Sequence, residues 1–91
     1  TLNYQQALLA FHKKDYNSAM LFVTKSIDHF NAELDTPLGF SYLLRGMIYD
    51  LSGQRKNAVA NYRLAINLDN HTVAMVEARK YLNRPYLNSI K

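Results

Sequence analysis

The sequence predicts an all-α fold, an α-α superhelix of about five antiparallel helices. Three observations predict it. Apolar residues recur at intervals of three and four along most of the chain, which is the spacing of one face of a helix. No segment alternates polar and apolar residues with a period of two, so a sheet is not expected. Glycine and proline are sparse, and most of them fall where these periodic stretches begin or end.

The first two helices are expected over about Leu2–His12 and Tyr16–Asn31. Asp15 stands immediately before the second and can cap it, because an aspartate carboxylate accepts a free N–H of the first turn. Both stretches carry a single apolar stripe. The stripe residues are Tyr4, Ala7, Leu8 and Phe11 in the first, and Tyr16, Ala19, Met20, Val23, Ile27 and Phe30 in the second.

The third helix is expected over about Pro37–Ser52 and is apolar nearly all round. A helix of this kind belongs between other helices. Asp35-Thr36-Pro37 is a start signal, since proline in the first turn loses no hydrogen bond and a preceding polar side chain can cap the helix. Gly53 is expected to end it.

The fourth helix is expected over about Arg55–Leu68, and Thr72 can cap a fifth over about 72–83. Pro85 prevents the fifth helix from continuing, because proline has no N–H to donate. The sequence therefore predicts five helices joined by short turns.

The composition is that of one small folded domain, spanning 1–91. Hydrophobic residues make up 48% of the chain and charged residues 20%, which is typical of a globular protein. There is no cysteine, so disulfides, cysteine-ligated metals and thiol catalysis are excluded. No apolar stretch approaches the roughly 18 residues of a membrane span. The sequence does not fix the compartment, although we favour the cytoplasm.

The chain contains an internal repeat. Ala19 and Ala58 lie 39 residues apart, and each is followed four positions later by a large residue, Val23 or Tyr62. Twelve positions before each alanine stands another small residue, Ala7 or Gly46, and eight positions after it stands an isoleucine. Small residues at such positions let two helices approach closely while large ones fill the space beside them. We expect close helix contacts at Ala19, Gly46, Ala58 and Ala65.

This pattern resembles the tetratricopeptide repeat, a helix–turn–helix unit of about 34 residues. The second unit carries the stronger match, through Tyr42, Arg45-Gly46, Tyr49, Leu51, Gly53, Ala58, Tyr62, Ala65-Ile66 and Leu68-Asp69. The first keeps Ala7, Asp15-Tyr16, Ala19, Val23 and Ile27 but has Gln6 and Ala10 where the family prefers large apolar residues. The resemblance implies a first repeat at about 2–34, a second at 37–70, a capping helix at 72–83 and a tail at 84–91.

Nothing in the sequence points to catalysis, and we expect the chain not to be an enzyme. No two of the histidines, His12, His29 and His71, have the i, i+4 spacing of a helical metal site. The glycines lie seven residues apart rather than clustered in a phosphate-binding loop. We therefore expect no catalytic residue, no metal and no cofactor.

The resemblance implies a function in protein–protein interaction. In this family the first helix of each repeat lines a concave groove that binds a partner helix or peptide. The corresponding apolar residues here, the candidate partner-binding site, are Tyr4, Leu8, Phe11, Phe40, Leu43, Leu44, Met47 and Leu51. Family members that bind acidic chaperone tails use lysine, asparagine and arginine in this groove. The matching positions here carry Tyr4, Leu8, Leu44, Ala74 and Ala78, so binding of such tails is not expected.

Several alternatives stay open. The groove could pair with a second copy in a homodimer, or be covered by the rest of a larger protein of which this chain is the terminal solenoid or an accessory domain. A rival function, which the sequence disfavours, is weak binding of nucleic acid. The formal net charge is +4, but the basic residues are scattered. Those that could serve are Lys13, Lys14, Arg55, Lys56, Arg79 and Arg84.

Overall fold

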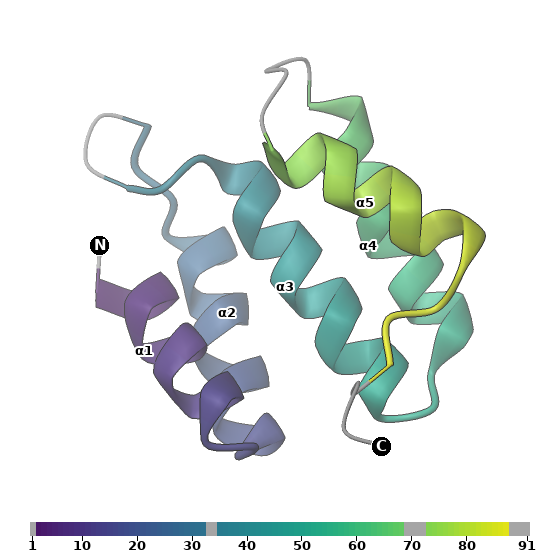
Figure 1. Ribbon diagram of the computed structural model, residues 1–91. Helices are drawn as coiled ribbons and strands as arrows, with labels where there is room; N and C mark the ends of the chain where they lie inside the picture. The colour runs from purple at the N-terminus through teal and green to yellow at the C-terminus, as the bar shows by residue number, and fades with distance from the viewer. Residues whose placement is uncertain (1, 33–34, 69–72, 88–91) are drawn as a thin grey trace.

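The computed structural model describes residues 2–32, 35–68 and 73–87. Within these ranges it contains five α-helices and no strand, which confirms the all-α prediction (Figure 1). The helices are α1 Leu2–His12, α2 Tyr16–Asp28, α3 Leu38–Leu51, α4 Arg55–Asn67 and α5 Val73–Asn83.

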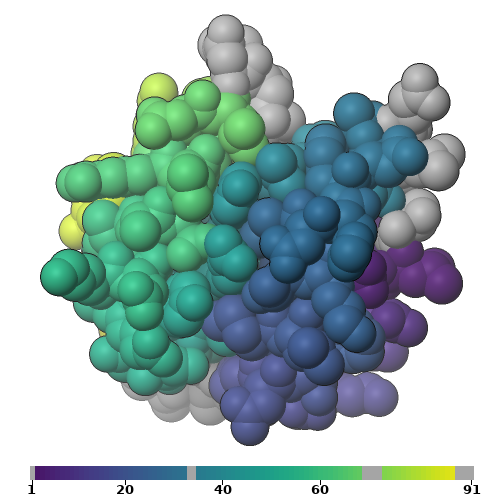
Figure 2. Space-filling view, turned by 180° about the vertical axis from the view of Figure 1, so that it is seen from behind, coloured from purple at the N-terminus to yellow at the C-terminus, as the bar shows by residue number. Residues whose placement is uncertain are grey.

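The helices pack as antiparallel neighbours in two layers. α1, α3 and α5 lie on the face turned toward the viewer in Figure 1, which we call the front face, and α2 and α4 lie behind them. Figure 2 shows the opposite face, which is formed largely by α2 and α4. α3 is central, because it contacts each of the other four helices. This arrangement explains why α3 is the helix that is apolar nearly all round.

α2 is shorter than predicted, because it ends at Asp28 rather than Asn31. A helix continuing through Asn31 would need its N–H to donate to the carbonyl four residues earlier. The Asn31 N–H donates instead to the Asp35 carboxylate at 2.7 Å. The Asp35 N–H in turn donates to the Asn31 carbonyl at 2.9 Å, which closes a turn. This reciprocal pair replaces the expected last turn of the helix.

The start of α3 also differs from the expectation. Pro37 is the residue before the first turn rather than within it, and no side chain caps this end of the helix. The Asp35 carboxylate, expected to cap α3, accepts the Asn31 N–H instead. By contrast, Asp15 does cap α2, accepting the Ser18 N–H at 3.2 Å. The cap predicted at Thr72 lies outside the described residues.

The α1–α2 and α3–α4 turns have the same geometry. Lys14 has a φ of 64° and Gly53 a φ of 76°, both in the left-handed region. In each turn the N–H of this residue donates three positions back, and the next N–H donates five positions back. This is the Schellman arrangement that ends many helices. Lys14 and Gly53 are 39 residues apart, as are Ala19 and Ala58.

The apolar interior consists of two clusters on either side of α3. Leu44 and Ile48 face the first cluster, whose other buried members come from α1 and α2: Ala7, Ala10, Ala19 and Val23. Leu43 faces the second, whose other buried members come from α4 and α5: Ala58, Tyr62, Ala65, Ala74 and Ala78. Small residues dominate both clusters, so the helix axes lie close together.

A close contact between α3 and α4 lies at Gly46. A Cβ atom placed on Gly46 would stand 2.5 Å from the ring of Tyr62, which is fully buried. The absence of a side chain at this position therefore makes room for an aromatic ring beneath α3. Ala19, Ala58 and Ala65 are also fully buried within the clusters. The four small residues predicted at helix contacts are all buried.

The shared turn geometry makes Lys14 and Gly53 a matched pair for substitution. A side chain in the left-handed region costs roughly 1–2 kcal/mol, whereas glycine is unstrained there. Lys14→Gly is expected to raise the free energy of unfolding by about 0.5–1 kcal/mol and Gly53→Ala to lower it by about 1 kcal/mol. Urea denaturation of both variants checks this. Changes of the same sign would contradict the assignment of the two turns.

Candidate functional site

Six of the eight predicted partner-binding residues lie partly exposed on α1 and α3. Tyr4, Leu8 and Phe11 pack against the first core cluster without being fully covered. Phe40 and Met47 pack in the same way against the second cluster. Leu51, at the end of α3, is also only partly buried. All six side chains therefore keep part of their apolar surface accessible to solvent.

The other two predicted residues lie in the interior. Leu44 is 3% exposed and belongs to the first cluster, and Leu43 is 9% exposed and belongs to the second. The cause is that α1 and α5 both contact α3, one on each side of it. Leu43 and Leu44 therefore belong to the core, whereas Met47, between Leu44 and the buried Ile48, remains partly exposed.

The segment after α5 folds back toward the end of α3. Residues 84–87 are not helical, and Figure 1 shows them turning from the end of α5 toward the last turn of α3. The Tyr86 ring lies 5.1 Å from that of Tyr81, edge to face, and 6.1 Å from that of Phe11. Tyr86 thus joins α5 to α1 across the front face. The sequence predicted a tail here but no contact for it.

Asp50 is the acceptor that fixes this segment. Its side chain is 2% exposed. Its carboxylate accepts the Tyr62 hydroxyl at 2.6 Å and the backbone N–H of Tyr86 at 2.9 Å. It also accepts Arg55 Nη1 at 3.0 and 3.2 Å. The same guanidinium donates through Nη2 to the Leu82 carbonyl at 2.8 Å, at the end of α5. One carboxylate therefore connects α3, α4 and the segment after α5.

The sequence carried a signal for this network. An aspartate on the apolar stripe of α3 needs a partner, because an unpaired buried carboxylate is strongly disfavoured. Arg55, five positions later at the start of α4, is close enough in the chain to be that partner. The Tyr86 N–H could not be foreseen, since it lies 36 residues from Asp50.

A cavity of about 140 Å³ lies beside Tyr86, at the end of the front face. It is lined by residues from α1, the α1–α2 turn, α2, α3 and the segment after α5, namely Phe11, His12, Lys14, Tyr16, Leu51 and Tyr86. Pockets for small molecules are typically about 300 Å³ or larger. This cavity is closer in size to a single amino-acid side chain. Its lining is largely aromatic, and Lys14 is its one permanently charged residue.

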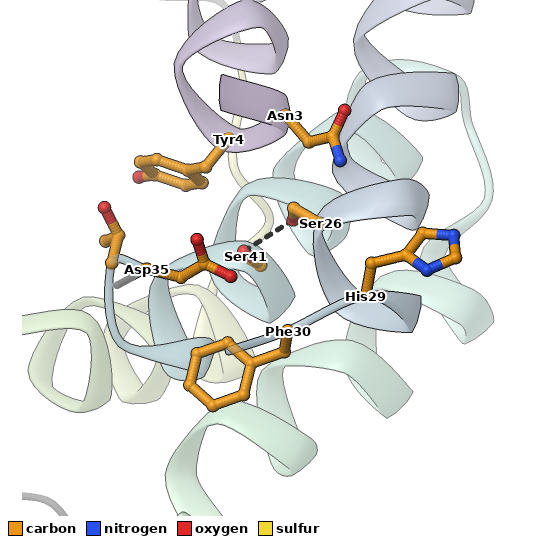
Figure 3. A pocket seen from close by; sticks show the side chains of 8 residues that line it. Asn3, Tyr4, Ser26, His29, Phe30, Asp35 and Ser41 are labelled. Carbon is orange, nitrogen blue, oxygen red and sulfur yellow. Dashed lines mark hydrogen bonds between the residues drawn. The ribbon is translucent and has the colours of Figure 1, made fainter. Parts of the chain in front are cut away.

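A second, much smaller cavity lies where α1, α2 and α3 meet near the α2–α3 loop (Figure 3). Its volume is about 10 Å³, enough for one water molecule at most. The Ser26 hydroxyl donates to Ser41 Oγ at 2.8 Å across it. Burial raises the pKa of Tyr4 at its rim. This hydrogen bond joins α2 to α3, and a cavity of this size offers no room for a substrate.

Most of the basic residues named by the sequence lie at or beside the ends of helices. Lys13 and Lys14 occupy the α1–α2 turn, Arg55 and Lys56 begin α4, and Arg84 follows α5. Figure 1 places the α1–α2 turn and the start of α4 at the lower end of the stack, whereas α5 ends higher, on the right. Arg55 is engaged with Asp50, whereas the other four side chains are exposed. Arg79, on α5, is exposed as well.

No group of three or more histidine, aspartate or glutamate side chains that could hold a metal ion occurs among residues 2–32, 35–68 and 73–87. Over the same residues, no helix has the length and apolar character needed to cross a membrane. His71 lies outside the described part of the chain.

The Asp50 network is expected to contribute strongly to stability. Asp50→Ala would leave the Tyr62 hydroxyl and the Tyr86 N–H without an acceptor and Arg55 without its counter-ion. Breaking a buried pair from one side costs about 3–5 kcal/mol, and the partial exposure of Arg55 reduces this to about 2–4 kcal/mol. Asp28→Ala, an exposed aspartate at the end of α2, is the control and should change stability by less than about 0.5 kcal/mol. Equal effects in urea denaturation would refute the network's role.

The buried tyrosines predict a loss of stability in alkali. Burial and the hydrogen bond to Asp50 raise the pKa of Tyr62 far above its usual value of 10, and burial with the Glu77 hydrogen bond raises the pKa of Tyr81 to about 12. In the unfolded chain both ionise near pH 10, so folding favours the protonated form. Stability from this source is complete below pH 10 and decreases above it. Melting temperatures between pH 8 and 11 test this, and Tyr81→Phe should weaken the decrease.

Comparison with known families bears on the second half of the molecule. Residues 41–72 match the family model described as tetratricopeptide repeat. Comparison with curated proteins and with solved structures gives no significant match. The matched residues take in most of α3, the Gly53 turn and all of α4, with Gly46 against Tyr62 at their contact. Tetratricopeptide repeats are typically non-catalytic scaffolds for protein interaction. The match supports a tetratricopeptide repeat at residues 41–72.

Proposed function

We propose that this chain is a non-catalytic protein–protein interaction module that binds an apolar segment of a partner protein on its front face. The observation that supports the proposal is the set of partly exposed apolar side chains on α1 and α3: Tyr4, Leu8, Phe11, Phe40, Met47 and Leu51. Large apolar side chains gathered on one surface mark interaction sites more often than isolated ones do.

Two of these residues carry most of the proposal. Phe40 and Met47 are two turns apart on α3, the spacing at which a helix presents neighbouring side chains along one stripe. Both remain partly exposed although α3 is covered on both sides. Methionine adapts its shape to different partners, and phenylalanine buries a large area at small entropic cost. Leu43 belongs to the cluster against which both residues pack and Leu44 to the other cluster, and neither is a contact residue in this proposal.

The experiment is selection of peptides from a displayed random library on the immobilised chain, followed by affinity measurement for the enriched sequences. Burial of one large apolar side chain contributes about 1.5–3 kcal/mol, so Met47→Glu should weaken binding by about tenfold or more. Leu64→Glu is the matched control, because Leu64 is a 44% exposed apolar residue on α4. It should leave the affinities unchanged.

Melting curves of both variants show whether the fold is intact. Equal affinity of the Met47→Glu and Leu64→Glu chains for every enriched peptide would exclude the front face as the binding surface. A library that yields no binding sequence would exclude peptide binding itself.

A further inference from the structure

Residues 84–87 lie on the front face in the way that an extended peptide ligand would. They are not helical, and Pro85 has no N–H of its own to satisfy. The next backbone N–H, that of Tyr86, donates to the buried Asp50 carboxylate at 2.9 Å. The Tyr86 ring lies between those of Phe11 and Tyr81. A main-chain hydrogen bond together with an aromatic anchor is the combination by which many domains hold extended peptides.

The fit of this segment to the domain is incomplete. Tyr86 is only partly buried, and Leu87 after it is 61% exposed. The cavity of about 140 Å³ remains open beside the ring. A ligand with a further side chain to place there would bury surface that the chain's own segment leaves uncovered. Such a ligand would therefore gain contacts that residues 84–87 do not make.

The charges around this site also disfavour the chain's own segment. Lys14 lines the cavity, and Arg84 adds a second positive charge two residues before Tyr86, whereas Lys13 lines a different hollow, together with Asp15. None of these three makes an ion pair with a described residue. Arg84 thus brings positive charge to a site that already holds Lys14. An acidic segment would complement Lys14, because opposite charges at the rim of an interface favour association.

We propose that the position of Tyr86 is a binding site for an extended acidic peptide with an aromatic residue, and that residues 84–87 occupy it as an intramolecular competitor. The partner's aromatic ring replaces that of Tyr86, its backbone N–H donates to Asp50, and a carboxylate of the partner approaches Lys14. This inference rests on the proposed function and specifies the chemistry of the partner.

The competition has a measurable consequence. A tethered segment is present at high effective concentration, so it lowers the apparent affinity for any ligand of the same site. The apparent affinity is reduced by the fraction of molecules in which the site is open. Removing the Tyr86 ring should therefore strengthen peptide binding, although the substitution deletes a native contact. A site that was not already occupied would show no such gain.

The probe is a fluorescent peptide with the sequence of residues 83–91 in which Arg84→Glu and Lys91→Glu reverse the two charges. We expect it to bind the Tyr86→Ala chain about tenfold more tightly than the unmodified chain, by fluorescence anisotropy at low salt. The Tyr86→Phe chain, which keeps the ring, should bind like the unmodified chain. The same peptide without charge reversal should bind the Tyr86→Ala chain several-fold more weakly, and this difference should shrink as salt increases.

Three results would overturn the inference: equal binding by the unmodified and Tyr86→Ala chains, no binding by either, or undiminished binding after the peptide's own Tyr86→Ala change. A second measurement on the unmodified chain guards against misfolding of the variant. There the acidic peptide should accelerate hydrogen exchange of the Tyr86 amide by displacing it from Asp50, and unchanged exchange at saturating peptide would refute displacement.

The inference and the proposed function can fail separately. Phe40 lies 11 residues before Leu51 on α3, or about 16 Å along the helix at 1.5 Å per residue. If Met47→Glu abolishes binding of library peptides while the acidic probe never competes with Tyr86, the proposed function stands and the inference fails. If the probe binds as expected but no library peptide depends on Met47, the site at Tyr86 stands and binding at the middle of the front face is lost.

Discussion

The carboxylate of Asp50 is the interaction on which the second half of the molecule depends. A buried charge destabilises a fold unless hydrogen bonds and an opposite charge compensate it. Here a guanidinium and a phenol, both from α4, and a backbone N–H from the segment after α5 supply that compensation. The geometry has little freedom. The Tyr62 hydroxyl reaches Asp50 because its ring lies beneath Gly46, one helical turn before Asp50. Close packing and charge compensation are therefore parts of one arrangement.

The regular part of the fold could be predicted because local rules govern it. The starts of α1, α2 and α4 follow from apolar periodicity, and the end of α3 follows from Gly53 in a left-handed conformation. Buried alanines at Ala19, Ala58 and Ala65 follow from the internal repeat. The link between α2 and α3 could not be predicted in the same way. Asp35 has two available roles at similar chain distance, and only the folded geometry selects Asn31 over the start of α3.

The candidate site was predictable only in part, for a physical reason. The sequence shows that α3 has a continuous apolar stripe, but it does not show how much of that stripe the flanking helices cover. Leu43 and Leu44 are large apolar residues, as contact residues often are, but both are buried like core residues. Tyr86 presents the opposite case, since a short segment after a proline shows no periodicity, and its contacts with Asp50 and Phe11 span long stretches of chain. Sequence patterns identify surfaces better than they identify what covers them.

The two apolar clusters on either side of α3 have a consequence for how the molecule opens. Because Leu44 and Ile48 serve one cluster and Leu43 serves the other, α1 and α2 can separate from the rest without disrupting the packing of α4 and α5. Such a molecule resembles a short row of adjoining units, in which each boundary has its own strength. Tyr86 crosses that boundary by touching Phe11 of the first unit from the far end of the chain. A ligand that displaces Tyr86 therefore also removes a contact that holds α1 and α2 to the rest of the molecule. Binding at Tyr86 is in this way coupled to the stability of the boundary between the two clusters.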